Sequence, residues 1–190
     1  SLAFPATITG EDAGELTVAA YFLGIPHPPG YPTWCLMAHP FMWLPWGTVA
    51  FRVALSSAVY GALAAGMVGL ITFELCASAF AAVLAGMCFA SARPVFDQAV
   101  IAEVYMLNAL FFSACSYVLL RWTRDRRGFW LLVLGLLVGL GQGVHNTMTV
   151  LAGVFALYVL CLEPRIVLHP RRILLPIALF AIGCLVYLYL

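Results

Sequence analysis

The chain has 190 residues, of which 64% are hydrophobic and 9% are charged. A soluble domain needs about 25% charged residues to keep its surface wetted, so this composition excludes a soluble globule and indicates an integral membrane protein. The net charge of +1 offers no basic surface for nucleic acid. We therefore expect the lipid bilayer as a partner and expect no nucleic-acid partner.

The chain starts at Ser1 and continues with a mostly apolar run over residues 2–8. This run is too short for a signal peptide and lacks a basic start. We interpret it as the trailing end of a membrane helix, and we expect the chain to be the amino-terminal fragment of a longer protein.

Residues 9–24 predict a short helix that lies along the outer membrane surface. Thr9 suits a helix cap, and acidic residues in the first turn suit the positive end of the helix dipole. Asp12 and Glu15 are three residues apart, so they share one face. An apolar stripe marks another face and comprises Leu16, Ala19, Ala20 and Leu23. Asp12 and Glu15 suit either a catalytic pair or a plain helix start, and the spacing alone favours the plain helix start.

Residues 25–32, IPHPPGYP, predict a rigid extended turn that suits a cis proline bond. His27 lies in this turn and titrates near neutral pH when unperturbed. The turn is either part of a preorganised site or a simple connector. Three tryptophans follow, and we interpret them as anchors at the membrane interface, namely Trp34, Trp43 and Trp46.

Apolar runs near 20 residues long predict membrane helices. We expect about six of them within residues 49–190, at 49–73, 75–90, 104–122, 129–143, 147–162 and 173–190. Together with a first outer loop at residues 9–48, they would form a single domain over residues 1–190.

Clustered arginines predict the orientation of these helices. One loop carries Arg121, Arg124, Arg126 and Arg127, and another carries Arg165, Arg171 and Arg172. The two loops are two spans apart, so they lie on one side, which the positive-inside rule makes cytoplasmic. By alternation, Glu74 is cytoplasmic too, whereas residues 9–48, residues 91–103 and the turn at residues 142–146 face outward. The use of arginine without lysine suggests a bacterial cytoplasmic membrane with the site on its periplasmic face.

Two further polar positions are candidates for function. Glu103 begins an apolar helix, where a carboxylate at membrane depth costs about 2.5–3.5 kcal/mol and usually faces a polar cavity. A position at the membrane boundary would cost less and needs no function. His145 lies with Gln142 and Asn146 at an outer helix junction, where polar contacts between helices are the favoured alternative to substrate binding.

Other sequence signals are weak. The six cysteines form no CxxC pair and no cluster with histidine, so neither a disulfide framework nor a zinc site is indicated. Gly135 and Gly139 form a GxxxG pair, which is a weak indication of close helix packing.

Three segments, taken together, resemble a known family. They are GEDAGELTVAAYFLGIPHPPGYPTW, LPWGTVAFRVALSSAVYGALAA and AEVYMLNALF, in this order along the chain. They resemble a bacterial domain-of-unknown-function family that is related to the animal transmembrane protein O-mannosyltransferases, in the GT-C glycosyltransferase superfamily. The resemblance covers residues from about Thr9 to about Gly153.

The resemblance implies an all-α, multi-pass GT-C-like bundle whose outer loop bears a short surface helix. It implies transfer of a mannose-like sugar from a polyprenyl-phosphate carrier to an acceptor hydroxyl, such as a protein Ser or Thr or a glycan, on the outer or lumenal face. Asp12 occupies the place of the family's catalytic carboxylate and Glu15 completes the DxGE pattern, although Ala13 replaces the usual serine. The remaining matches are His27 and Tyr31 in the HPPGYP loop, and Glu103 and Tyr105 in the EVY motif.

A physical scheme follows from the resemblance. The enzyme needs a base for the acceptor hydroxyl, which we assign to Asp12, and a positive charge for the departing phosphate. Glu15 or Glu103 would orient the acceptor or the sugar, and a single displacement would invert the anomeric centre. The outer-side candidates for phosphate contact are Arg93, Arg52 and His27. We expect no cofactor besides the lipid-linked donor and no required metal.

Two other functions remain open at the level of sequence. In a transporter or flippase-like protein, Glu103, Asn108 and His145 would line a translocation path. Such proteins place their charges near mid-membrane and usually contain repeats, whereas the carboxylates here gather toward one face. In a membrane scaffold without catalysis, Asp12 and Glu15 would tolerate substitution.

Overall fold

The computed structural model describes residues 12–190, and every regular element in that range is helical. The predicted all-α class is therefore confirmed for these residues. Residues 12–48, which belong to the predicted outer loop and are called the outer segment below, contain α1 (Ala13–Phe22), α2 (Pro32–Ala38) and the 3-10 helix η1 (His39–Trp43). The predicted cap at Thr9 and the apolar run at residues 2–8 lie outside the described residues.

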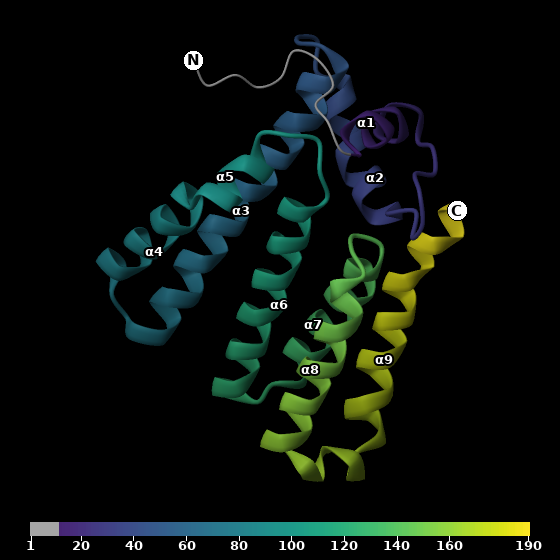
Figure 1. Cartoon of the computed structure of the whole chain (residues 1–190). Coiled ribbons are helices and arrows are strands. Elements are labelled where there is room, and N and C mark those ends of the chain that lie inside the picture. Colours follow the sequence, from purple (N-terminus) through teal and green to yellow (C-terminus); the bar gives the residue numbers. More distant parts are fainter. Residues whose placement is uncertain (1–11) are drawn as a thin grey trace.

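The remaining helices run up and down beside one another, and α1 and α2 sit at one end of them (Figure 1). They are α3 (Val49–Cys76), α4 (Ala79–Ser91), α5 (Arg93–Ala99), α6 (Tyr105–Asp125), α7 (Gly128–Gln142), α8 (Thr147–Leu162), η2 (Pro164–Leu168), α9 (Pro170–Cys184) and η3 (Leu185–Tyr189). The six longest of these helices overlap the six predicted spans, with ends that differ by a few residues.

The helices differ in whether their length and composition suit a membrane span. Among the described residues, α3 and the continuous run Pro170–Tyr189 are long and apolar enough to cross a membrane. The α4–α5 pair meets the same criterion as one unit but bends by 65° at its break. Helices α7 and α8 are apolar but shorter, with 15 and 16 residues. Residues 12–190 thus contain two such helices, or three if the bent pair is one span, against the six that the sequence predicts.

The bend between α4 and α5 lies in the segment between two of the predicted spans. No helix was predicted within residues 91–103, and α5 occupies much of this segment. Pro94 lies in the first turn of α5, where its missing N–H costs nothing, whereas the same proline would interrupt a continuing α4. The chain therefore turns and starts a new helix instead of forming an irregular loop.

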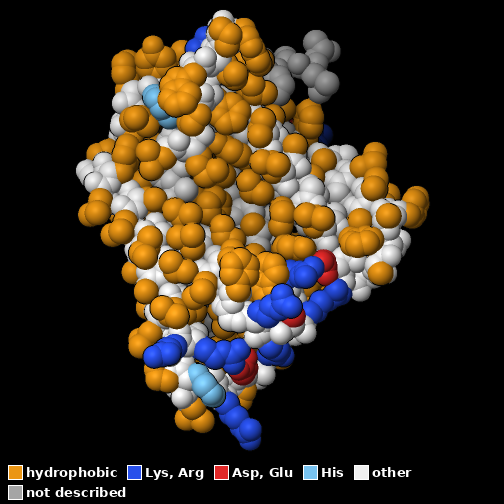
Figure 2. All heavy atoms as spheres, turned by 180° about the vertical axis from the view of Figure 1, so that it is seen from behind, with side chains coloured by type: hydrophobic (Ala, Val, Ile, Leu, Met, Phe, Trp, Pro, Cys, Tyr) orange, Lys and Arg blue, Asp and Glu red, His pale blue; other side chains and the backbone are white. Residues whose placement is uncertain are grey.

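Arginines gather at one end of the molecule, opposite to α1 and α2 (Figure 2). Glu74, near the end of α3, accepts hydrogen bonds from Arg121 at 2.7 Å and from Arg124 at 2.6 Å, both on α6. This contact agrees with the prediction that Glu74 lies on the side of the arginine-rich loops. The opposite end carries the outer segment.

Helices α7 and α9 approach each other closely at the GxxxG pair. A Cβ atom on Gly135 would lie 2.3 Å from the carbonyl oxygen of Pro176, and one on Gly139 would lie 2.2 Å from that of Phe180. No side chain fits at such separations, so glycine allows the two backbones to touch. The weak packing signal in the sequence is confirmed.

Candidate functional site

The candidate site centres on His27, which one carboxylate holds through two hydrogen bonds. The backbone N–H of His27 donates to Glu15 Oε1 at 2.6 Å, and Nδ1 lies 2.8 Å from Glu15 Oε2. The other ring nitrogen, Nε2, lies 3.2 Å from the hydroxyl of Tyr31 and 3.7 Å from Asp12 Oδ2. The structure therefore brings together four residues that the sequence singled out.

The turn between α1 and α2 folds back on itself to make this cluster. The Pro28–Pro29 peptide bond is cis, as the proline-rich sequence suggested. Gly30 has a φ of +90°, which favours glycine, and its N–H donates to the carbonyl of His27 at 3.0 Å. Tyr31 follows in the left-handed region, and its ring meets that of His27 edge-on with centroids 5.3 Å apart.

The cluster shifts the pKa values of its own members. The hydrogen bond from His27 lowers the pKa of Glu15, and the hydrogen bond to Glu15 raises the pKa of His27, with the negative charge of Asp12 adding to the rise. Burial raises the pKa of the Tyr31 hydroxyl, and the neighbouring carboxylates raise it further. His27 is therefore protonated over a wider pH range than a free imidazole.

Asp12 presents a largely free carboxylate at the edge of the cluster. It is the N-cap residue of α1, yet its side chain makes no capping hydrogen bond and is 59% exposed. The simple capping interpretation of Asp12 therefore lacks its expected contact. An exposed carboxylate beside a histidine is accessible to a substrate, and its catalytic role stays a prediction.

The EVY motif approaches the same cluster from the start of α6. Glu103 is buried, with 4% exposed, and its negative charge contributes to the raised pKa values of both His27 and Tyr31. Tyr105 also contributes to the raised pKa of Tyr31, and its ring centroid lies 5.6 Å from that of His145. The first and the third of the three sequence segments that carry the resemblance therefore lie close together in space.

Trp34 corrects the expectation of an interfacial anchor. Its side chain is fully buried and its indole N–H donates to the backbone carbonyl of Glu103 at 3.2 Å. Ser57, on α3, donates to the same carbonyl at 3.3 Å. Trp34 thus ties α2 to the start of the EVY motif. Trp43 and Trp46 are exposed, and their role as anchors at the membrane interface stays a prediction.

His145 takes part in contacts between helices. Its Nδ1 lies 3.0 Å from the hydroxyl of Thr147, which in turn donates to Asn108 Oδ1 on α6 at 3.2 Å. Burial lowers the pKa of His145. These contacts support the interpretation of His145 as a polar contact between helices. The ring of His145 also lies beside that of Tyr105, which places His145 near the cluster.

The two predicted arginine contacts to phosphate have other partners. Arg93 is exposed and pairs at 3.7 Å with Asp97, four residues later on α5. The guanidinium of Arg52 donates to the carbonyls of Met42 at 2.9 Å and Trp46 at 3.1 Å, so it fastens the loop before α3. Of the three predicted phosphate contacts, His27 is the one that the described structure places in the cluster.

Long-range hydrogen bonds fix the position of the loop, and sequence reasoning missed them. The Thr33 hydroxyl donates to the carbonyl of Leu140 at 2.7 Å, and its backbone N–H donates to that of Gly143 at 3.0 Å. The Tyr189 hydroxyl donates to the carbonyl of Gly24 at 3.1 Å. The two hydroxyl groups bind partners that are 107 and 165 residues away in the sequence, so no local pattern could have indicated these bonds.

Asp12, Glu15 and His27 also satisfy a geometric criterion for a metal site. Each offers a ligand atom, and these atoms lie within 4.8 Å of one another. Carboxylate and imidazole ligands suit several divalent ions. Such an ion would compete with the Glu15–His27 hydrogen bonds, and the expectation that no metal is required stays a prediction.

The fold and the site define an all-helical, membrane-associated protein with a carboxylate–histidine cluster at one end of its helices. The family described as "Protein O-mannosyl-transferase TMEM260 N-terminal domain" matches residues 12–167, and the chain belongs to this family. The resemblance seen in the sequence is therefore confirmed.

Two named relatives are similar to this chain. Protein O-mannosyl-transferase TMEM260 of Mus musculus is 33% identical over 202 residues, which cover 100% of this chain and 28% of the mouse protein. Protein O-mannosyl-transferase tmem260 of Dictyostelium discoideum is 27% identical over 123 residues, which cover 63% of this chain and 15% of that protein. The chain thus spans less than a third of the length of either relative. No solved structure is significantly similar to it.

Proposed function

We propose that the chain belongs to a multi-pass membrane glycosyltransferase that transfers a mannose-like sugar from a polyprenyl-phosphate carrier to an acceptor hydroxyl. The names of the two relatives support the sugar and the class of reaction. The acceptor would be a protein Ser or Thr, or a glycan, on the outer or lumenal face of the membrane. The observation that carries the proposal is the Asp12–Glu15–His27–Tyr31 cluster, which lies at the end opposite to the arginines.

Asp12 would act as the general base. Its carboxylate takes the proton of the acceptor hydroxyl while the acceptor oxygen forms a bond to the anomeric carbon of the sugar. The bond between that carbon and the phosphate oxygen breaks, and the bonding electrons leave with the polyprenyl phosphate. This single displacement inverts the anomeric centre, and the reaction as written needs no metal ion. The exposed position of Asp12 supports this role.

Glu15 would act as a positioning residue, because both of its oxygens already bind His27. The ring of His27, whose pKa Glu15 and Asp12 raise, would supply in its protonated form the positive charge that the departing phosphate needs. Tyr31 and Tyr105 would add hydroxyl contacts to the sugar or phosphate. This assignment replaces the initial idea that Glu15 orients the acceptor directly.

The position of the charges favours transfer over transport. Asp12, Glu15 and His27 belong to an outer segment and have exposed or half-buried side chains. A translocation path places its ionisable groups within the membrane-spanning helices. With the arginine-rich end on the cytoplasmic side, the cluster would face the periplasm of a bacterial membrane or an organelle lumen.

The test is sugar transfer by the full-length protein in membranes, with radiolabelled polyprenyl-phosphate mannose as the donor. We compare wild type with Asp12→Asn and use Asp97→Asn as the matched control, because Asp97 is an exposed carboxylate on α5. Loss of a general base predicts a fall in transfer of about 10²–10⁴-fold for Asp12→Asn at unchanged expression, and no comparable loss for Asp97→Asn. Equal transfer by wild type and Asp12→Asn would remove Asp12 from the mechanism, and no transfer by wild type would refute the mannose donor.

A further inference from the structure

The turn between α7 and α8 brings His145 beside the turn between α1 and α2. The carbonyl of Gly143 accepts a hydrogen bond from the backbone N–H of Thr33 at 3.0 Å. Thr33 follows Tyr31 by two residues, and Gly143 precedes His145 by two. The ring of Tyr105, at the start of α6, lies 5.6 Å from that of His145, centroid to centroid. His145 is therefore a neighbour of both segments that carry the cluster.

A fixed donor decides which nitrogen of the His145 ring carries the proton. The backbone N–H of Thr147 donates to Nδ1 at 3.2 Å. A backbone N–H cannot turn its proton away, unlike the Thr147 hydroxyl that lies 3.0 Å from the same atom, so Nδ1 is an acceptor. The proton of the neutral ring is then on Nε2, because the hydrogen bond at one ring nitrogen sets the state of the other. Burial lowers the pKa of His145, so this neutral form dominates at neutral pH.

The Nε2–H group of His145 is a donor that the described chain leaves available. Within residues 12–190 it makes no hydrogen bond, and its side chain is half-buried. A donor in such a place needs an acceptor from water or from a ligand, because an unmet donor costs free energy. His145 thus fastens the helix junction through one nitrogen and keeps the other for a further contact.

His27 and His145 differ in charge, and the difference matches the two parts of a sugar phosphate. Asp12 and Glu15 raise the pKa of His27, and its protonated ring suits the phosphate. The neutral N–H of His145 suits an uncharged hydroxyl, and the adjacent ring of Tyr105 offers an aromatic surface for a sugar ring. Groups whose environments move their pKa values apart take different roles in a site.

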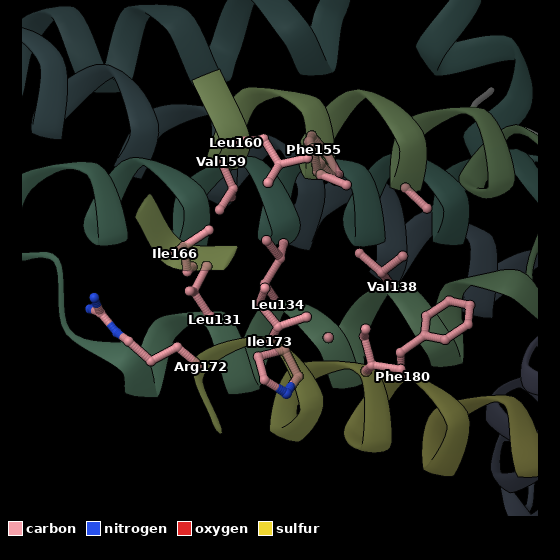
Figure 3. A pocket seen from close by; sticks show the side chains of 15 residues that line it. Leu131, Leu134, Val138, Phe155, Val159, Leu160, Ile166, Arg172, Ile173 and Phe180 are labelled. Carbon is pink, nitrogen blue, oxygen red and sulfur yellow. The ribbon is translucent and has the colours of Figure 1, made fainter. Parts of the chain in front are cut away.

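The apolar pocket among α7, α8 and α9 is no alternative place for a sugar. Its lining, drawn in Figure 3, is apolar apart from Arg172. That arginine pairs with Glu163 and donates to the carbonyl of Arg126 at 2.9 Å. A sugar hydroxyl would lose its hydrogen bonds to water there without replacement. At His145 the same hydroxyl gains a donor.

We propose that the sugar ring of the donor lies against Tyr105 and that one of its hydroxyls accepts a hydrogen bond from Nε2–H of His145. This inference rests on the proposed function, because it takes the phosphate of the same donor to be at His27. His145 is then a specificity residue, since a sugar without that hydroxyl would leave the N–H unpaired.

Two substitutions of His145 separate the roles of its two nitrogens. Asparagine places its amide near the position of Nδ1, so His145→Asn keeps an acceptor for the Thr147 N–H and removes the donor at Nε2. Glutamine is one bond longer, so His145→Gln keeps an N–H near the position of Nε2 and removes the acceptor at Nδ1. Sugar binding should therefore survive His145→Gln, whereas the helix junction should survive His145→Asn.

The measurement is equilibrium binding to the full-length protein in nanodiscs, with polyprenyl-phosphate mannose and sugar-free polyprenyl phosphate as the two ligands. His145→Asn should weaken binding of the mannose lipid about threefold to tenfold, as expected for one neutral hydrogen bond, and leave binding of polyprenyl phosphate unchanged. His145→Gln should bind the mannose lipid as wild type does, although it unfolds at a lower temperature. His169→Asn is the matched control, because His169 contacts the carbonyl of Arg165 in the arginine-rich end, and it should affect neither ligand.

Three outcomes would overturn this inference alone, because wild type would still bind the donor. Equal losses for the two lipids in His145→Asn would assign His145 to the fold. Equal weakening of the mannose lipid by His145→Asn and His145→Gln would do the same. Unchanged binding of the mannose lipid in His145→Asn would show that Nε2–H meets water or a later part of the full-length protein. Failure of wild type to bind either lipid would instead overturn the donor class of the proposed function, and this inference with it.

Discussion

His27 and Glu15 form a paired contact in which each carboxylate oxygen has its own partner. Oε1 accepts from the backbone N–H of His27 at 2.6 Å and Oε2 lies 2.8 Å from the ring nitrogen Nδ1. Because the backbone and the ring are held together, the ring cannot rotate without losing one of the two bonds. The opposite ring nitrogen, Nε2, is thereby fixed toward Asp12 and Tyr31.

This pair predicts a pH profile for sugar transfer. His27 has a pKa above its usual 6.5, so its charge and the stabilisation from the pair are complete below pH 6.5 and are lost as the pH rises through the raised value. Glu15 has a lowered pKa, so its contribution is present above 4.5 and is lost as the pH falls through the lowered value. If His27 holds the phosphate, transfer falls on the alkaline side of the profile.

Glu15→Gln should therefore move that alkaline limb to lower pH, because the neutral amide no longer stabilises the imidazolium. The measurement is initial rate against pH for the full-length protein, wild type beside Glu15→Gln, with Asp97→Asn as the carboxylate control on α5. An alkaline limb at the same pH in wild type and Glu15→Gln would show that the charge of His27 does not control transfer.

Thr33 supports a prediction about the docking of the site loop on α7. Its side chain is buried and its hydroxyl donates to the carbonyl of Leu140 at 2.7 Å. Thr33→Val keeps the shape and removes this bond, so we expect a loss of about 1 kcal/mol in the free energy of unfolding. The lost docking bond should also raise the KM for the donor, since the loop carries His27 and Tyr31.

Thermal unfolding in detergent and transfer kinetics measure these effects. Thr72→Val is the matched control, because the hydroxyl of Thr72 donates within its own helix, to Val68 at 2.9 Å. A KM that is equal in Thr33→Val and Thr72→Val would refute a role for this bond in positioning the loop.

Sequence reasoning succeeded where a feature is local and failed where it depends on tertiary contact. The hydropathy of residues 49–73 predicted α3, and the resemblance placed Asp12, Glu15, His27 and Tyr31 in one site. The same reasoning assigned Trp34 to the membrane interface, because an aromatic residue near a span has that preference on average. In the structure a partner on another segment, the carbonyl of Glu103, decides its position instead.

Helix α5 and Arg52 illustrate the same limit. A short polar segment between apolar runs has no hydrophobic period, so nothing in residues 91–103 indicated a helix. Arg52 was a candidate for phosphate because of its side and charge, yet two backbone carbonyls of the preceding loop use its guanidinium. The loop geometry that presents those carbonyls cannot be read from the arginine itself.

Glu74 supports a prediction about the arginine-rich end. Its side chain is 15% exposed and binds both Arg121 and Arg124, whose side chains are 36% and 49% exposed, so Glu74→Gln removes the shared anion of two cations that water reaches. We expect a loss of about 1 kcal/mol in the free energy of unfolding, because solvent screens these ion pairs. Asp97→Asn removes an exposed pair with a 3.7 Å separation and should change stability by less than about 0.5 kcal/mol.

Thermal unfolding of both variants in the same detergent measures the difference. The double variant Glu74→Gln/Arg121→Gln should recover part of the loss, because it removes one of the cations left unpaired. Equal stability of Glu74→Gln and Asp97→Asn would mean that the contact between α3 and α6 at this end contributes no more than a surface pair.

The approach of α7 to α9 predicts that the GxxxG glycines tolerate no side chain. In Gly139→Ala the new Cβ would lie 2.2 Å from the carbonyl oxygen of Phe180, so the two backbones must separate. Overpacking of this kind costs about 1–3 kcal/mol. Separation of α9 would also displace Tyr187 and Tyr189, whose hydroxyls bind the carbonyls of Gln142 and Gly24.

Gly153→Ala on α8 is the matched control, since a Cβ there meets nothing within 4 Å and alanine favours a helix. We therefore expect Gly139→Ala to lower the unfolding temperature and sugar transfer together, and Gly153→Ala to lower neither. A stable Gly139→Ala with normal transfer would contradict the close contact. A destabilised variant with normal transfer would instead show that the end of α9 does not position the Gly24 loop, because stability and positioning would then be separable.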